Sequence, residues 1–282
     1  MLRHWLAHPV LHGLDVDDPR TTTLRRQIIQ DNRFLRQIYR EWYEALSAVL
    51  PEVPGAVLEL GSGAGFLSDM IPDLITSEVF WCDHIRMVID GQRLALRDAQ
   101  LRAIVMTDVL HHVPNVRALF AEAARCVRPG GVLALIEPWV SSWSQVVYTR
   151  LHHEPFRPQT PAWEFPPQGP LSGANGALPW IVFERDRTQF EREFPQWRIE
   201  TIRPFMPFRY LVSGGVSLRA LMPGWSFGAW RGLEKMFDPW MKTWAMFALI
   251  VLRRERSCVA EAERWKEGRS HGAAWPSTYR II

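Results

Sequence analysis

The sequence feature that most constrains the fold is a glycine-rich turn between two apolar segments. The apolar run 56–60 suits a buried strand and leads directly into Gly61-Ser62-Gly63-Ala64-Gly65. Glycine at alternate positions leaves no Cβ in the way, so backbone N–H groups can approach a ligand closely where a helix begins. We expect that helix over residues 64–71. A strand, a glycine-rich turn and a helix form the first unit of a nucleotide- or nucleoside-binding α/β domain.

Composition excludes several other classes of protein. The chain has 282 residues, enough for a substantial core, and its net charge of +3 comes from scattered arginines. Without a run of basic residues we expect no nucleic-acid partner. The three cysteines, Cys82, Cys126 and Cys258, form no Cys-x-x-Cys pair. Cys82 and Cys126 lie in apolar segments, so we expect buried free thiols and no metal site.

The first residues and the apolar segments of the chain bear on where in the cell the protein is found. The first residues lack the apolar core of a signal peptide. The longest clean apolar run, 246–252, is far shorter than the ~20 residues that span a bilayer. We therefore expect a cytoplasmic protein. The segment 225–244 is rich in tryptophan and carries Arg231 and Lys235, so it could also lie on a membrane surface as an amphipathic helix.

Strand-like and helical segments alternate after the glycine turn. Repeated βα units predict a doubly wound, mostly parallel sheet. The expected strands are 56–60, 78–82, 86–89, 101–107 and 132–136, followed by a short strand or buried run at 181–183 and strands at 197–205 and 246–253. The late strands would complete a seven-stranded sheet. The expected helices are 21–50 with a break at 31–32, then 115–127, 141–153, 186–194, and 213–244 with breaks at 223–224 and at 239.

These segments suggest four regions. We expect an N-terminal helical cover over residues 1–54 and a binding core over 55–138. A large insertion after the fifth strand, with the last strands, would occupy 139–253 and hold the acceptor. Its stretch 155–176 is rich in proline and glycine and is expected to be a long loop. Residues 254–282 would form a polar tail.

Carboxylates follow several of the predicted strands. They are Glu59, Asp83, Asp90, Asp108 and Glu137. Ligands of open α/β sheets bind at the carboxyl ends of the strands, where these side chains would gather. Asp83 lies about 18 residues after Gly65, the spacing that suits ribose hydroxyls. Glu59, beside the turn, would repel a pyrophosphate but suit an ammonium or sulfonium group, which favours S-adenosylmethionine (SAM) over NAD.

Four segments resemble one enzyme family. Residues 57–65 resemble the first motif of class I SAM-dependent methyltransferases, and 104–113 are similar to the fourth-strand motif of the type 11 group. Residues 122–133 resemble the helix, Pro-Gly-Gly turn and fifth strand that follow, and 90–94 resemble the segment near the adenine. The four occur in the family's order, within residues 55–138. The resemblance implies a Rossmann-like fold.

The resemblance assigns cofactor roles by position. The methionine part of SAM would be held by Glu59, Gly61, Ser62, Gly63 and Gly65, and the ribose by Asp83, with His84 beside it. Asp90 and Gly91 would lie near the adenine, and Thr107 and Asp108 near the sulfonium. One departure is that only residues 84–89 separate Asp83 from Asp90, where most relatives have a full helix.

The resemblance implies methyl transfer from SAM to a small-molecule acceptor or to one linked to a lipid or glycan, at oxygen or nitrogen. The candidate catalytic residues are Tyr148, His152 and His153, because they form the densest polar cluster of the second half and histidine suits base work near neutral pH. His111 and His112 are expected to serve packing, and Asp108 is equally suited to capping a turn. Two alternatives are a non-catalytic SAM- or nucleoside-binding regulator and a dinucleotide-binding protein.

Overall fold

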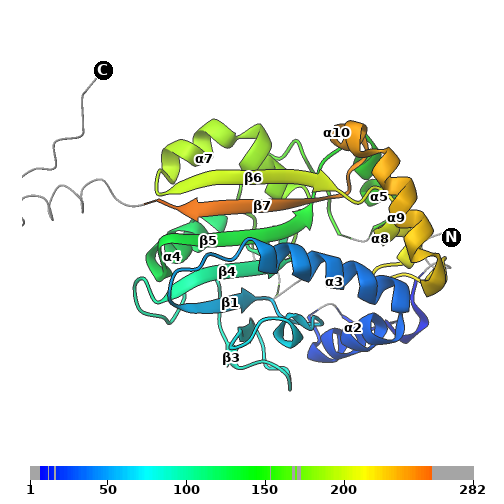
Figure 1. Ribbon diagram of the computed structural model, residues 1–282, viewed down its shortest axis with the longest axis horizontal. Coiled ribbons are helices and arrows are strands. Elements are labelled where there is room, and N and C mark those ends of the chain that lie inside the picture. The colour runs from blue at the N-terminus through cyan, green and yellow to red at the C-terminus, as the bar shows by residue number, and fades with distance from the viewer. Residues whose placement is uncertain are drawn as a thin grey trace, which may run out of the picture.

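A central sheet of seven strands organises the molecule (Figure 1). The computed structural model describes residues 7–255 except 12, 16, 153, 167, 168 and 170–172. The strands are β1 (Ala56–Leu60), β2 (Ile75–Glu78), β3 (Met87–Val88), β4 (Leu101–Thr107), β5 (Val127–Pro138), β6 (Trp197–Phe205) and β7 (Phe247–Arg254). Their order is β3-β2-β1-β4-β5-β7-β6, and β7 alone of these runs in the direction opposite to the other six. The predicted seven-stranded, mostly parallel sheet is confirmed.

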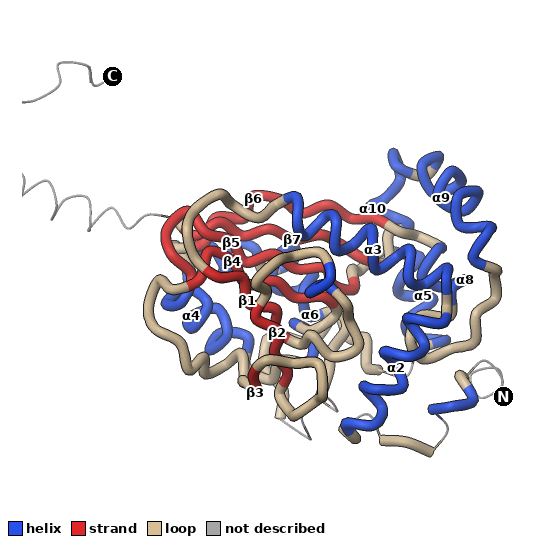
Figure 2. Tube along the Cα trace, turned by 60° about the horizontal axis from the view of Figure 1, so that its bottom comes forward, coloured by secondary structure: helices blue, strands red, loops and turns tan. Residues whose placement is uncertain are grey.

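Helices pack on both faces of this sheet. They are α2 (Pro19–Asp31), α3 (Arg33–Ala48), α4 (Val116–Cys126), α5 (Ser142–Leu151), α6 (Leu178–Trp180), α7 (Arg187–Glu193), α8 (Arg209–Ser213), α9 (Phe227–Met236) and α10 (Met241–Trp244). Figure 1 shows α3 in front of the sheet and α4 behind it. Figure 2, turned by 60°, shows α2 and α3 meeting at an angle beside the ends of the strands. Both helices come from the segment expected to cover the core.

The expected break between α2 and α3 falls at Asn32. Its backbone is extended (φ −85°, ψ 95°), which ends α2. Its side-chain oxygen accepts hydrogen bonds from the N–H groups of Phe34 and Leu35, both at 3.1 Å. Asparagine is favoured at this capping position because its short side chain satisfies N–H groups that have no partner within the helix. The helix that follows buries Leu35, Ile38 and Trp42 against the sheet.

Two predicted elements are wrong in detail, and a third is decided between two alternatives. Residues 64–71 hold only a single 3₁₀ turn, Leu67–Asp69, in place of the expected helix. The second strand is residues 75–78, earlier than the predicted 78–82. Residues 181–183 are a buried run, one of the two expected alternatives, but they form no strand and begin a π-helical segment, Ile181–Arg185, that continues α6. A run of three buried apolar residues fits a strand and a buried helix equally well, so pattern alone could not separate them.

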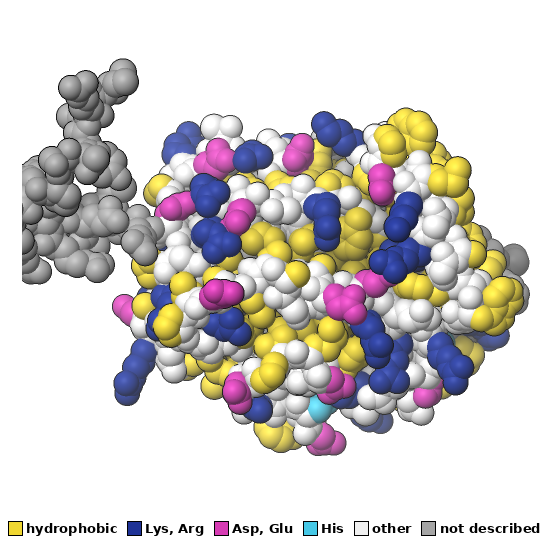
Figure 3. All heavy atoms as spheres, in the orientation of Figure 1, with side chains coloured by type: hydrophobic (Ala, Val, Ile, Leu, Met, Phe, Trp, Pro, Cys, Tyr) yellow, Lys and Arg dark blue, Asp and Glu magenta, His cyan; other side chains and the backbone are white. Residues whose placement is uncertain are grey.

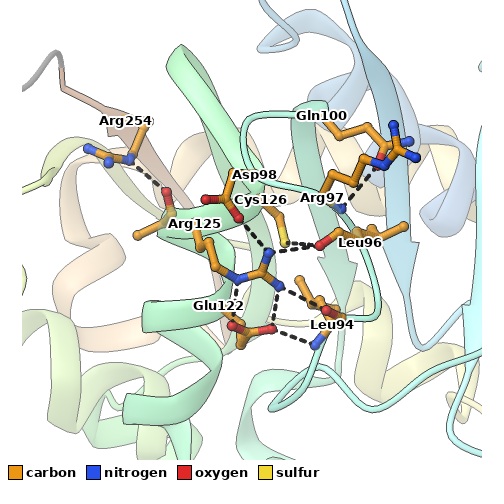
Figure 4. Close-up of polar contacts among 10 residues, drawn as sticks. Leu94, Leu96, Arg97, Asp98, Gln100, Glu122, Arg125, Cys126 and Arg254 are labelled. Carbon is orange, nitrogen blue, oxygen red and sulfur yellow. Dashed lines mark hydrogen bonds and ion pairs between the residues drawn. The ribbon is translucent and has the colours of Figure 1, made fainter.

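The connections between β2, β3 and β4 contain no helix. The expected lack of a helix between β2 and β3 is therefore confirmed. The β3–β4 loop is held onto α4 by Arg125, as Figure 4 shows. Its guanidinium donates hydrogen bonds to the carbonyls of Leu94 and Leu96 at 2.9 and 2.8 Å, and pairs with Asp98 and Glu122. Hydrogen bonds from the Arg125 side chain therefore hold the β3–β4 loop in place where no helix does.

The helix expected over 213–244 is found only in part, because α8 ends at Ser213 and helical structure resumes at Gly224. Other expectations are confirmed or lie outside the described residues. Cys82 and Cys126 are buried free thiols, as expected, and Cys258 lies outside the described residues. The helix 115–127 is found as α4, with Asn115 as its capping residue. The segment expected to be a polar tail, 254–282, lies outside the description except for its first two residues. Among the described residues, no helix is both long and apolar enough to cross a membrane.

Candidate functional site

A cavity of about 420 Å³ opens at the carboxyl ends of β1, β2 and β4. We call it the main cavity. Figure 1 shows the strand arrows of β1 and β4 ending on the side where α2 and α3 lie. Its walls include the glycine turn, the ends of β2 and β4, residues 89–92, the segment 109–114 after β4 and the N-terminal helices, together with Leu119, Gly169 and Val216. The cavity therefore lies where a doubly wound sheet binds ligands.

Two residues of the glycine turn have a positive φ, a backbone conformation that favours glycine. Gly61 has φ +67°, and a Cβ built on it would lie 2.4 Å from a methyl group of Val109. Gly63 has φ +30°, and its Cβ would lie 3.0 Å from Oε2 of Glu78. Positive φ disfavours residues with side chains, and both neighbours crowd the position that a Cβ would occupy. Both glycines line the main cavity with their backbone.

The acidic residue at the end of β2 is Glu78, not Asp83. Glu78 is buried and lines the main cavity, and its Oε1 accepts a hydrogen bond from the Val79 N–H at 2.9 Å. Burial raises the pKa of this carboxyl. Asp83 is exposed in the loop after β2 and does not line the cavity. The sequence signal that favours Glu78 is the β-branched pair Ile75-Thr76, whereas the aromatic run 80–81 suggested a strand that the structure lacks.

Several predicted cofactor residues support the glycine turn from outside the cavity. Glu59 is buried beneath the turn, where its carboxylate accepts a hydrogen bond from the Ser62 hydroxyl at 2.7 Å. Burial raises the pKa of Glu59 to about 7, more than the Ser62 hydrogen bond lowers it. The ring of His84 hydrogen-bonds the carbonyl of Gly63, and Arg26 donates to the carbonyl of Gly65.

The predicted cofactor residues thus fall into two groups. Those that line the main cavity are Gly61, Gly63, Asp90, Gly91, Thr107 and Asp108. Those that do not line it are Glu59, Ser62, Gly65, Asp83 and His84. Asp90 is turned toward its own loop, where it accepts hydrogen bonds from the backbone and side chain of Gln92 at 2.9 and 3.1 Å.

Three buried polar atoms on the cavity wall have no hydrogen-bond partner. They are Nε of Arg25, Oγ1 of Thr107 and Nδ1 of His112. Buried polar groups in native proteins are nearly always paired, so three unpaired atoms around one cavity are what a polar ligand would satisfy. Arg25 comes from α2, and no motif in the sequence singled it out. Its cation suits a carboxylate such as that of an amino-acid group.

Behind the cavity, a buried ion pair joins β5 to the segment after β4. His111 Nδ1 lies 2.8 Å from Glu137 Oε2. The other oxygen of Glu137 accepts hydrogen bonds from the N–H groups of Val109 and Leu110 at 2.8 and 2.7 Å. His111 Nε2 lies 3.4 Å from Glu154, and His112 Nε2 lies 3.7 Å from the same carboxylate.

Charge in this cluster is distributed unevenly. Burial disfavours a charged His111, but its bonds to Glu137 and Glu154 outweigh burial and raise its pKa well above the usual value. Burial and the neighbouring His111 lower the pKa of His112 to about 4. Burial would raise the pKa of Glu154, but the surrounding histidines hold it well below its usual range. His111 is therefore the cation of the cluster, and His112 is neutral at pH 7.

Asp108 lies where two cavities meet. It lines both the main cavity and a separate void of about 10 Å³, whose walls include Tyr148, Glu154 and Phe247. Its backbone has φ +63°, a conformation that aspartate tolerates better than most residues. Burial and the nearby Glu137 and Glu154 raise its pKa to about 7, against the lowering effect of His111.

Two sets of side chains in this cluster have the spacing of metal ligands. His111, His112 and Glu154 form one, and Asp108, His111 and Glu137 form the other; within each set the ligand atoms lie within 4.8 Å of one another. In the structure these atoms pair with each other as acids and bases, with His111 bonded on both ring nitrogens. We assign no metal to them.

Two of the predicted catalytic residues, Tyr148 and His152, line the small void beside Asp108. The Tyr148 hydroxyl donates to the Met246 carbonyl at 3.0 Å, and burial raises its pKa well above 10. The Tyr148 proton is thus engaged with a backbone carbonyl, and the catalytic role of Tyr148 stays a prediction. His152 accepts a hydrogen bond from the Glu154 N–H at 3.3 Å and packs edge-on against the Tyr148 ring. His153 lies outside the described residues.

The family of the chain follows from a sequence comparison. A family model described as a methyltransferase domain matches residues 32–208, which is more than half of the chain. The chain therefore belongs to this methyltransferase family. It is a SAM-dependent methyltransferase, and SAM is its methyl donor. The predicted class of enzyme and the predicted cofactor are confirmed.

A solved structure with a TM-score above 0.5 shares the fold, and other solved structures are similar. A SAM-dependent methyltransferase from Thermotoga maritima has a TM-score of 0.53 at 13% identity, over 84% of this chain and 98% of that one. The geranyl diphosphate C-methyltransferase of Streptomyces coelicolor A3(2) has a TM-score of 0.47 at 14% identity, over 89% of this chain and 90% of that one. No curated protein matches the sequence.

Proposed function

We propose that this methyltransferase acts on an oxygen or nitrogen of an acceptor that is partly apolar, a small molecule or one linked to a lipid or glycan. The observation that carries the proposal is the position of Asp108, on the wall of the main cavity and of the void behind it. With the cofactor in the main cavity and the acceptor in the void, the Asp108 carboxyl would lie between them.

The residues of the main cavity fit SAM. Glu78 would accept hydrogen bonds from the ribose hydroxyls, and the backbone of Gly61 and Gly63 would contact the methionine part. Arg25 would pair with the methionine carboxylate, which would satisfy its buried Nε. Asp90, Gly91 and Gln92 would border the adenine. When bound, SAM supplies an electrophilic methyl group on a sulfonium sulfur.

The role of the protein in the reaction is to orient the acceptor and to take its proton. Asp108 is placed to accept a hydrogen bond from an acceptor hydroxyl or amine, and a pKa of about 7 suits a general base at neutral pH. His111, held as a cation by Glu137 and Glu154, offsets the negative charge of the carboxylates beside Asp108. His112 offers an unpaired Nδ1 to a second polar group of the acceptor.

The apolar part of the acceptor would occupy the space between α5 and α8. A small cavity of about 40 Å³ there has mostly apolar walls and shares Val216 with the main cavity. Its walls include Val147, Leu151, Leu211, Leu218 and Met246. This cavity and the void beside Asp108 also share Tyr148, His152 and Tyr210. An acceptor with an apolar group beside its nucleophile would fit this arrangement.

The test is an acceptor panel that pairs each hydroxyl or amine with and without a long alkyl or aryl group. We expect turnover, measured as S-adenosylhomocysteine formed, to favour the apolar members. Leu211→Ala should raise KM for those members and leave the Kd for SAM unchanged. Val146→Ala, on the exposed side of α5, is the matched control and should change neither. Equal turnover across the pairs would refute the apolar site.

A further inference from the structure

The outer face of α9 carries a stripe of exposed apolar side chains. Trp225 is 88% exposed, Leu233 39%, Met236 69% and Trp240 58%. Together with the exposed Ala229 they recur at intervals of three or four residues, which places them on one side of the helix and its two flanking turns. We call these five residues the α9 stripe. Figure 3 shows hydrophobic side chains gathered along the upper right edge, over α9 and α10.

The opposite face of α9 already holds the helix in place. Phe227 is buried edge-on against Phe34 at 5.1 Å, and Phe237 packs edge-on against Phe208 at 5.0 Å. Glu234 is buried in an ion pair with Arg209, which also pairs with Glu41 at 2.6 Å. The α9 stripe therefore adds nothing to the core, and an apolar face that the fold does not use marks a contact surface.

Exposed apolar side chains concentrate at this end of the molecule. Among the described residues, ten large hydrophobic side chains are exposed, and six of them lie here. The six are Val10, Leu221, Trp225, Leu233, Met236 and Trp240. Val10 belongs to the group because it shares a cavity wall with Met222 and Gly224. Scattered exposed residues need no explanation, but a concentration of this kind does.

The residues around the stripe identify its occupant. Between Gly224 and Trp244 the chain has three exposed basic residues and one exposed acidic residue, Asp238. Of the basic residues, Arg231 pairs with Glu41 of α3 at 3.1 Å, and Lys235 and Lys242 are the other two. Figure 3 shows Lys and Arg side chains beside the hydrophobic edge. The stripe has a tryptophan at each end, and tryptophan favours the boundary between headgroups and acyl chains. Apolar side chains flanked by cations suit an anionic lipid bilayer.

We propose that the α9 stripe docks the enzyme onto an anionic lipid surface, with α9 lying in the plane of the interface. Docking depends only on this face and holds whatever the acceptor is. One consequence rests on the proposed function: residues 214–218, which line the apolar cavity, lead directly to Leu221. A lipid-linked acceptor would then reach that cavity from the surface to which the enzyme is bound.

The experiment is co-sedimentation of the full chain with phosphatidylglycerol-rich and with pure phosphatidylcholine vesicles. We expect binding to the anionic vesicles that weakens as salt is added. Trp225→Ala with Trp240→Ala should lower the partition coefficient about tenfold or more, and Lys235→Glu should lower it about tenfold on anionic vesicles. Trp81→Ala is the matched control, because this tryptophan is 63% exposed but lies in the loop after β2.

Folding and SAM binding separate the possible outcomes. Each variant should keep the wild-type circular dichroism and Kd for SAM, so a loss of vesicle binding cannot come from misfolding or from an error in the proposed function. The proposal is overturned if the full chain does not bind anionic vesicles, or if the double variant binds them as well as the Trp81 control does. A dimer that dissociates in the double variant, without vesicle binding, would instead assign the stripe to self-association.

Discussion

His111 and Glu137 form an ion pair that is closed off from solvent, with Nδ1 and Oε2 2.8 Å apart and side chains 1% and 0% exposed. The same carboxylate holds the N–H groups of Val109 and Leu110. The pair therefore ties the end of β5 to the turn that follows Asp108. Asp108 itself has a positive φ, and the ion pair keeps the Asp108 side chain at the junction of the two cavities.

Glu137→Gln tests this role. The amide keeps the shape of the side chain and one acceptor oxygen, but it removes the charge that faces a buried imidazolium. Breaking a buried ion pair by removing one partner costs about 3–5 kcal/mol, so we expect a loss of about 3 kcal/mol in the free energy of unfolding, measured in urea. Glu122→Gln, which weakens the partly exposed pair with Arg125, should cost about 1 kcal/mol or less. Equal losses would contradict a special role for Glu137.

Asp108→Asn tests the general base. We expect kcat to fall by about 10²–10⁴-fold, with the Kd for SAM changed little, because the amide cannot take a proton. In the wild type the base works only when ionised, so kcat/KM should rise with pH through about 7. The variant should lose this rise. A rising limb that persists unchanged in the variant would assign it to another group.

Glu78→Ala and Asp83→Ala decide which carboxylate binds the ribose. Hydrogen bonds to a charged group contribute about 1.5–3 kcal/mol, so Glu78→Ala should raise the Kd for SAM by about tenfold or more in calorimetry. Asp83→Ala should change it by no more than about twofold, because that side chain is exposed outside the cavity. The reverse result would restore the prediction made from sequence spacing.

Glu59→Gln should change how stability depends on pH. The pKa of Glu59 is raised from 4.5 to about 7 in the folded protein, so between these values the folded state binds more protons than the unfolded state. The contribution of Glu59 to the free energy of unfolding therefore falls as pH rises, by about 3 kcal/mol over this window. The variant lacks this contribution. Its stability relative to wild type should thus increase from pH 4.5 to 7, and parallel curves from urea titrations would show that Glu59 titrates normally.

Gly61→Ala tests the glycine turn. The new methyl group would meet Val109 at 2.4 Å, on a backbone with φ +67°. We expect a loss of about 2 kcal/mol or more in the free energy of unfolding and weaker SAM binding. Gly232→Ala is the control, because it lies in α9 with open space around its Cβ position and should stabilise the helix slightly. A Gly61→Ala variant as stable as the control would show that the turn tolerates a side chain.

The sequence by itself determined the features that depend on neighbouring residues. A turn with positive φ is a local demand, and it explains the glycines at positions 61 and 63. The alternation of segments predicted the seven-stranded sheet, and the short loop between β2 and β3 was visible as a missing helix. Asp90, Thr107 and Asp108 were placed at the cavity because they follow strands, and parallel strands bring their carboxyl ends to one edge.

Only the tertiary structure decided what depends on residues far apart in the chain. Glu78 and Asp83 both follow segments that suit a strand, and only the pairing of Ile75 with Leu58 on β1 and of Glu78 with Val88 on β3 shows that the strand spans 75–78. Glu137 and Glu154 meet His111 across 26 and 43 residues, and burial then sets which of these groups carries charge. Periodicity shows that α9 has two apolar faces, but only packing against Phe34 and Arg209 shows which one is left to solvent.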